Sequence, residues 1–159
     1  MADPQQEREI IRRRLLGVAL ACPQIAPGTD LGRDLVLKKG PTGVDLARVE
    51  KVDALTQSLE IALTTALGSD LFNTDFGFDG LNALAEGSSP VITRERVRVS
   101  VIDVLRKDPR VRGILDVKLD DGRLDPPPPG SRTLDVRVAF ETLSGDPVTA
   151  RFGRAVPNA

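Results

Sequence analysis

The sequence predicts an α+β domain, with helices in the first two thirds of the chain and an antiparallel sheet in the last third. Three stretches before residue 109 repeat apolar residues at three- and four-residue intervals, which is typical of helices that bury one face. Three later stretches alternate apolar and polar residues, which is typical of half-buried strands. We therefore expect an N-terminal helix and two further helices packed on a small, mainly antiparallel sheet that ends in a C-terminal β-meander.

The first element is predicted to be an amphipathic helix over residues 1–22. Asp3 can cap this helix, and Pro4 is suited to its first turn. Residues 23–33 are rich in proline and glycine and are interpreted as a linker, and residues 34–159 as a single α+β domain. The apolar face of the first helix consists of residues at helical spacing, namely Ile11, Leu15, Val18 and Cys22.

The middle of the chain contains a predicted hairpin and the clearest helix. Residues 34–38 and 43–49 alternate apolar and polar side chains on either side of a Gly-Pro-Thr-Gly turn, which indicates a small hairpin. Apolar residues then recur at helical spacing over residues 52–66, and Gly68 is a natural stop. Residues 69–92 are expected to be irregular because glycine and proline interrupt them.

A third helix is predicted to start at Thr93, which can cap it, and to end before Pro109. The three alternating stretches between residues 111 and 152 then predict the meander. Prolines at residues 126–129 form a stiff spacer between its first two strands. The last strand lies at an edge of the sheet, and the sequence alone leaves open whether this edge is free or covered.

The composition excludes several kinds of chemistry. The chain has no His and one Cys, which excludes Ser–His and Cys–His catalysis, an intrachain disulfide and a Cys-based zinc site. We predict neither a metal ion nor a cofactor, and no apolar run approaches the ~18 residues of a membrane span. Carboxylate catalysis is the option that remains, although surface ion pairs explain such residues more simply. The candidate carboxylates are Glu60, Glu95, Asp103 and Asp108.

A basic segment covers residues 94–112, with seven basic and three acidic residues and a net charge of +4. Such a segment can bind nucleic acid or an acidic protein surface, although a solvated helix face is the commoner explanation. Asp108, Pro109 and Arg110 form a turn within it, directly after the predicted helix. Proline fixes this turn, which suits the carboxylate and the guanidinium to pairing with a partner chain. A plain helix stop is the alternative.

The scarce aromatic residues are concentrated at one place in the chain. Three of the five phenylalanines, Phe72, Phe76 and Phe78, lie close to Gly77. We interpret this loop as a lid over the core, with an exposed binding hot spot as the alternative.

Several short motifs follow one another in a distinctive order. They are Asp34-Leu35, Leu55-Thr56-Gln57-Ser58-Leu59, Leu63-Thr64-Thr65 with Gly68, Phe72, Asp75-Phe76-Gly77, and Asp108-Pro109-Arg110 before the strands. Their order and spacing resemble the baseplate-wedge, sheath-initiator family of contractile injection machines, over about residues 31–154. This family includes small lysozyme-like wedge proteins of contractile-tailed phages, extracellular injection systems and type VI secretion baseplates. The chain departs from it where Ser69-Asp70 follow Gly68, at Thr74, and where Asp108 replaces a glutamate.

The resemblance implies a structural role without turnover. Six copies are expected around the tube, with wedge proteins and sheath subunits as partners, tube or hub proteins as further candidates, and no nucleic acid. The protein would be cytoplasmic before assembly and then part of the baseplate of a phage tail or injection particle. The C-terminal strands would be a template for the first sheath ring, through Leu134, Val136, Val138, Phe140, Val148, Ala150 and Phe152.

The resemblance also assigns roles to single residues. The turn of Asp108, Pro109 and Arg110 would contact wedge subunits. The structural motif of the family corresponds to Gln57, Thr65, Gly68, Phe76 and Gly77. From the apolar face alone, we further infer that Ile11, Leu15 and Val18 of the first helix join the same wedge bundle.

Two other functions remain open at this point. One is a peptidoglycan-cleaving glycosidase that uses a carboxylate pair. The other is a small adaptor that binds nucleic acid through residues 94–112.

Overall fold

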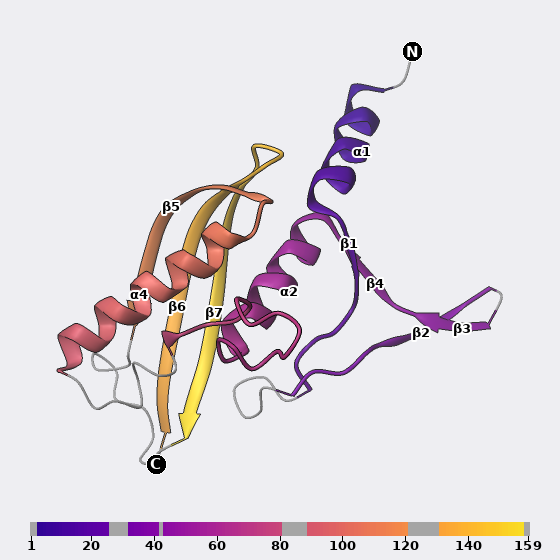
Figure 1. Ribbon diagram of the computed structural model, residues 1–159. Coiled ribbons are helices and arrows are strands. Elements are labelled where there is room, and N and C mark those ends of the chain that lie inside the picture. The colour runs from indigo at the N-terminus through magenta and orange to yellow at the C-terminus, as the bar shows by residue number, and fades with distance from the viewer. Residues whose placement is uncertain (1–2, 26–31, 42, 81–88, 121–130, 158–159) are drawn as a thin grey trace.

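A three-stranded antiparallel sheet covered on one face by two helices forms the core of the protein (Figure 1). This computed structural model describes residues 3–25, 32–41, 43–80, 89–120 and 131–157. The sheet has the order β5-β6-β7 and forms a meander, as predicted. Its strands are β5 (Val111–Asp120), β6 (Ser131–Thr142) and β7 (Pro147–Pro157). The covering helices are α2 (Lys51–Thr64) and α4 (Pro90–Lys107).

The buried face of the sheet follows the predicted two-residue alternation. Val136, Val138, Phe140 and Thr142 of β6 are all buried, because alternate side chains of a strand point to the same face. Ala150 of β7 is buried beside them. The helices contribute Leu55, Leu59, Ala62, Leu63, Val97, Val101, Val104 and Leu105 to the same core. The α+β fold class is therefore confirmed.

The first part of the chain forms a second group of elements. Strand β1 (Val18–Leu20) pairs antiparallel with β4 (Arg48–Glu50), directly before α2. Between them, β2 (Leu37–Gly40) and β3 (Gly43–Leu46) form the predicted hairpin, which extends away from the sheet (Figure 1). None of the described helices combines the length and the apolar character that a membrane span requires.

The predicted first helix is too long. Helix α1 (Pro4–Leu16) begins as expected, because the Asp3 carboxylate accepts a hydrogen bond from the Gln5 backbone N–H. It ends at Leu16, since Gly17 adopts a φ of +83° and donates its N–H to the Arg13 carbonyl. Val18 therefore lies in β1, and Cys22 lies beyond that strand.

The apolar face predicted for the first helix does not enter the core of the protein, and its expected contact with a wedge bundle stays a prediction. Leu16 is the buried residue of α1, whereas Ile11 and Leu15 are 46% and 36% exposed. Val18, at 44%, is exposed on β1. The four-residue spacing correctly identified Ile11 and Leu15 as neighbours on the surface of the helix, but these side chains face solvent.

Helices α2 and α4 form where the sequence predicted helices, although their ends differ from the predicted ones. Helix α2 buries the predicted stripe, and Gly68, with a φ of +76°, follows within four residues of its end. Helix α4 begins at Pro90 rather than Thr93, since Ser89 is its N-cap and Thr93 donates its N–H to the Ser89 carbonyl. It ends at Lys107, before Pro109, as expected. Of the segment 69–92 that was expected to be irregular, residues 90–92 belong to α4, and residues 81–88 lie outside the described residues, as does the proline spacer 126–129.

The Phe-rich loop is held by backbone hydrogen bonds after α2. Phe78 donates its N–H to the Thr65 carbonyl at 2.8 Å, and Gly68 donates to the Phe76 carbonyl at 3.3 Å. Phe78 is buried, as a lid over the core requires, and Phe76 packs half-buried against it. Phe72 is fully exposed, so the lid interpretation holds for two of the three rings.

Replacing Gly77 by Ala is expected to destabilise the fold by about 2–4 kcal/mol. Gly77 has a φ of +113°, and an added Cβ would lie 2.8 Å from the Ala66 carbonyl oxygen. Urea unfolding followed by circular dichroism measures the loss. Gly113→Ala is the matched control, because no atom lies within 4 Å of its added Cβ. Equal stabilities of the two variants would contradict the close approach at Gly77.

Candidate functional site

The turn of Asp108, Pro109 and Arg110 is closed by an ion pair within the chain. Arg110 donates from Nε to Asp108 Oδ1 at 2.9 Å and from Nη2 to Asp108 Oδ2 at 2.6 Å. The Arg110 backbone N–H also donates to Asp108 Oδ1, at 2.9 Å. Pro109 fixes the backbone between them, so the two side chains meet in the planar, two-bond geometry that suits guanidinium and carboxylate. The pairing predicted with a partner is thus made internally.

The pair shifts the protonation of both groups. Burial acts to raise the pKa of Asp108, but the hydrogen bonds and the positive charge of Arg110 outweigh it, so this pKa lies below its ordinary value of 3.8. The hydrogen bond to Asp108 raises the pKa of Arg110 above its ordinary value. Both groups are therefore charged at neutral pH.

Arg110 also joins segments that are distant in the sequence. Its Nη1 donates to the Leu16 carbonyl, at the end of α1, at 3.2 Å. Its own carbonyl accepts a hydrogen bond from the Leu143 N–H, in the turn between β6 and β7, at 2.8 Å. One residue therefore connects α1, the α4–β5 turn and the β6–β7 turn.

A groove of about 1040 Å³ brings this turn together with the Phe76–Gly77 motif. Side chains of α2, including Ile61, form one wall, and the C-terminal end of α4 forms another. Lys107 closes the groove by donating from Nζ to the Asp75 carbonyl at 2.8 Å. Two motifs separated by 30 residues in the sequence thus share one surface.

Gln57 and Thr65 lie elsewhere and have contacts within the chain. Gln57 donates from Nε2 to the Leu20 carbonyl and accepts from the Cys22 N–H, both at 2.8 Å, and so holds the end of β1 against α2. Thr65 donates from Oγ1 to the Ile61 carbonyl at 2.7 Å. These interactions hold the end of β1 and the end of α2 in place, and the role that the resemblance assigns to both residues stays a prediction.

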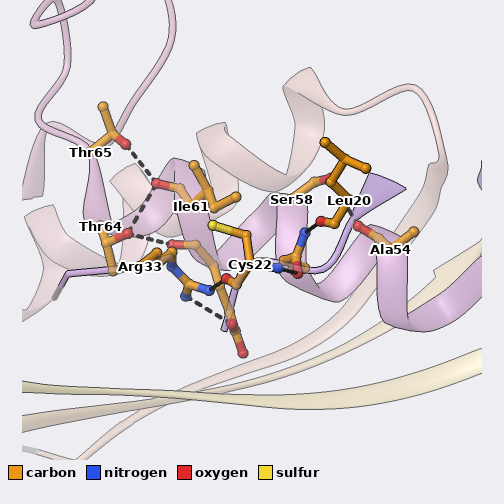
Figure 2. A network of polar contacts seen from close by, with 10 residues as sticks. Leu20, Cys22, Arg33, Ala54, Ser58, Ile61, Thr64 and Thr65 are labelled. Atoms are coloured by element: carbon orange, nitrogen blue, oxygen red, sulfur yellow. Dashed lines mark hydrogen bonds and ion pairs between the residues drawn. The ribbon is translucent and has the colours of Figure 1, made fainter. Parts of the chain in front are cut away.

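Arg33, which the sequence analysis did not single out, is the centre of a polar network (Figure 2). It donates from Nη1 to the Cys22 carbonyl and from Nη2 to Glu60, both at 2.9 Å. Gln24 and Arg33 also form an isolated antiparallel bridge, which closes the predicted linker on itself. The sequence signal was weak, because a single arginine in a Pro- and Gly-rich stretch gives no spacing pattern.

The edge of the meander at β7 has backbone groups that point away from the sheet. Thr142 donates its N–H to the Asp146 carbonyl at 2.9 Å, which makes Phe140–Val148 and Val138–Ala150 the hydrogen-bonded pairs, because such pairs alternate. The N–H groups of Thr149 and Arg151 therefore point outward, and neither donates a hydrogen bond to another described residue.

The side chains predicted for strand addition mostly lie in the core. Val136, Val138, Phe140 and Ala150 are buried. Val148 and Phe152 are partly buried against the same core, and the side chain of Leu134 lies outside the described residues. These residues set the register of the sheet, and its outer edge presents backbone groups.

The candidate carboxylates do not converge. Glu60 pairs with Arg33 and Asp108 with Arg110. Glu95 and Asp103 are eight residues apart on α4, about 12 Å along the helix axis, whereas glycosidase pairs lie ~5–10 Å apart. Among the described residues, no group of three or more His, Cys, Asp or Glu could hold a metal ion.

Several cations of the basic segment have partners within the chain. Lys107 donates to the Asp75 carbonyl, Arg110 pairs with Asp108, and Arg112 lies 3.3 Å from Glu141. Arg98 lies 3.8 Å from Glu95, one turn earlier on α4. These contacts favour a solvated, ion-paired helix face.

Solved structures with a similar fold include a tail protein. The crystal structure of a candidate tail lysozyme from Geobacter sulfurreducens superposes with a TM-score of 0.50 and 19% sequence identity. The match covers 67% of this chain and 92% of that one. No family model and no curated protein matches the chain. At this identity, the comparison supports a shared fold.

Replacing Asp108 by Asn is expected to lower the free energy of unfolding by about 1–2 kcal/mol at pH 7, because the Arg110 guanidinium loses its charged acceptor. The pKa of Asp108 is lower in the folded protein than its ordinary value of 3.8, which applies to the unfolded chain. The ion pair therefore stabilises the fold fully at a pH above 3.8, and this stabilisation disappears as the pH falls through the pKa of the folded protein. Urea titrations at pH 7 and in acid should therefore show a difference that shrinks in acid. Asp116→Asn removes an exposed ion pair with Lys118 and serves as the control. A difference that does not change with pH would count against the pair.

Proposed function

We propose that this chain is a structural component of a contractile phage tail or a related injection machine. In this proposal it docks on baseplate wedge proteins and starts sheath assembly by offering β7 to the first sheath ring. The observation that carries the proposal is the outward-pointing backbone of β7 beside a filled core. The likeness to a candidate tail lysozyme and the order of the motifs support a role in a tail.

Strand addition suits β7 better than the opposite edge. The pairing of β6 with β7 runs without a register shift from Ser131–Pro157 to Glu141–Pro147. The pairing of β5 with β6 has shifts at Val111/Gly113 and Ile114/Asp116, and such bulges discourage further pairing at an edge. A regular edge strand can accept an extended segment of another chain through its backbone.

The groove beside the Asp108–Arg110 turn is the proposed contact with the wedge. Pro109 is exposed at its rim and Phe76 is half-buried in its wall. Asp108 and Arg110 form their hydrogen bonds with each other. Their contribution to docking is therefore to hold the shape of this surface. Pro109 and Phe76 then supply apolar contact, which is the usual source of binding energy at the centre of an interface.

A glycosidase is the second candidate function, and the description of the similar structure as a tail lysozyme favours it. The separation of Glu95 and Asp103 and the pairing of Glu60 and Asp108 favour the structural role. A general acid also needs a raised pKa, whereas the pKa of Asp108 is lowered.

Thr149→Pro is expected to prevent sheath growth on assembled baseplates, because it removes an outward N–H without touching the bonds between β6 and β7. Thr149→Ala keeps that N–H and is the matched control. Electron microscopy of particles that carry each variant measures the fraction with sheath. We expect bare tubes for the proline variant and normal sheaths for the alanine variant.

Circular dichroism of both purified variants should show that each is folded. Full-length sheaths on folded Thr149→Pro particles would contradict strand addition at this edge.

The purified chain is expected to leave a suspension of peptidoglycan turbid. Clearing that Glu95→Gln abolishes would instead establish the glycosidase and overturn the structural proposal. Asp116→Gln is a control for the general effect of removing an exposed carboxylate.

A further inference from the structure

Helix α1 turns a charged stripe toward its own protein. Glu9, Arg12, Arg13 and Leu16 follow the i, i+3, i+4, i+7 spacing of one helical face. Glu9 pairs with Lys51 and Arg12 with Asp146, and Arg13 lies 2.9 Å from Glu50. Only Leu16 of this stripe enters the core. The helix is thus attached mainly by ion pairs.

The exposed apolar residues of α1 lie outside this stripe. Ile10, Ile11 and Leu15 are 55%, 46% and 36% exposed. A helix rotates by about 100° per residue, which places Ile10 and Ile11 on either side of Glu7 and Arg14 and away from Leu16, with Leu15 at the edge of this face. Glu7 and Arg14 are exposed, and neither forms an ion pair with a described residue. An isoleucine-rich face without an intramolecular partner is typical of a binding surface.

The charges on this face are arranged symmetrically. Along the sequence, the midpoint between Glu7 and Arg14 is the same as the midpoint between Ile10 and Ile11. Two copies of α1 in antiparallel orientation, related by a two-fold axis at this midpoint, would place Ile10 opposite Ile11. The same symmetry places each Glu7 opposite the Arg14 of the other copy.

We propose that α1 binds α1 of a second copy of this chain, as an antiparallel, two-fold symmetric pair. A two-fold interface must be complementary to itself, and the Glu7–Arg14 arrangement meets this condition. Opposite charges also favour the antiparallel orientation, since a parallel pair would place Glu7 beside Glu7. This inference does not depend on the proposed role in a contractile machine.

Sedimentation velocity over a concentration series tests the pair with the full chain at low salt. The unmodified protein should form a dimer as its concentration rises. Glu7→Arg and Arg14→Glu should each weaken dimerisation roughly tenfold, because each change makes two attractive contacts repulsive. The double variant Glu7→Arg/Arg14→Glu should restore it, since the exchanged charges are again complementary.

Two further variants complete the design. Ile11→Ser should reduce dimerisation by removing apolar contact, while Lys39→Glu on the β2–β3 hairpin should not change it. Circular dichroism checks that each variant is folded. A protein that stays monomeric at the highest concentration, or a dimer that the charge reversals leave unchanged, would overturn the proposal and leave this face to a partner of another kind.

Discussion

The contact of Arg110 with Asp108 determines how the two halves of the protein are joined. The guanidinium is held flat by the two hydrogen bonds that it donates to the Asp108 carboxylate, and this directs its remaining Nη1 donor toward the Leu16 carbonyl. Leu16 is fully buried and ends α1, so the position of that helix depends on this contact. Arg110 also accepts a hydrogen bond from Leu143, so the turn between β6 and β7 is fixed at the same point.

This arrangement changes the meaning of the motif that the sequence presents most clearly. A carboxylate and a guanidinium around a proline suit a partner chain by their chemistry, but here each is the other's partner. Breaking such a partly buried pair leaves a charge without compensation, which makes the turn rigid. In the proposed docking, the exposed Pro109 and the neighbouring groove meet the partner without any rearrangement of the charged residues.

Local patterns predicted α2 and the meander, because their side chains bury against each other with helical or strand periodicity. Leu55 and Leu59, and Val136 and Val138, lie where the spacing placed them. Which side of α1 meets the rest of the protein was not predictable in this way. Its orientation is decided by Glu50, Lys51 and Asp146, which lie far along the chain and attract charged residues. Likewise, the end of α1 depends on the positive φ of Gly17, and the site of Arg33 depends on Glu60.

Attachment by ion pairs makes α1 the element whose position is most sensitive to conditions. Exposed ion pairs contribute little to stability, and salt weakens them further. A hydrogen bond from Lys51 lowers the pKa of Glu9, and hydrogen bonds from Ser144 and Arg12 lower the pKa of Asp146. Glu9 and Asp146 therefore stabilise the attachment of α1 at a pH above their ordinary pKa values of 4.5 and 3.8. This stabilisation disappears in acid, as the pH falls through their lowered pKa values. Core packing does not share this dependence, so salt and acid act on the attachment of α1 more than on the sheet and its β7 edge.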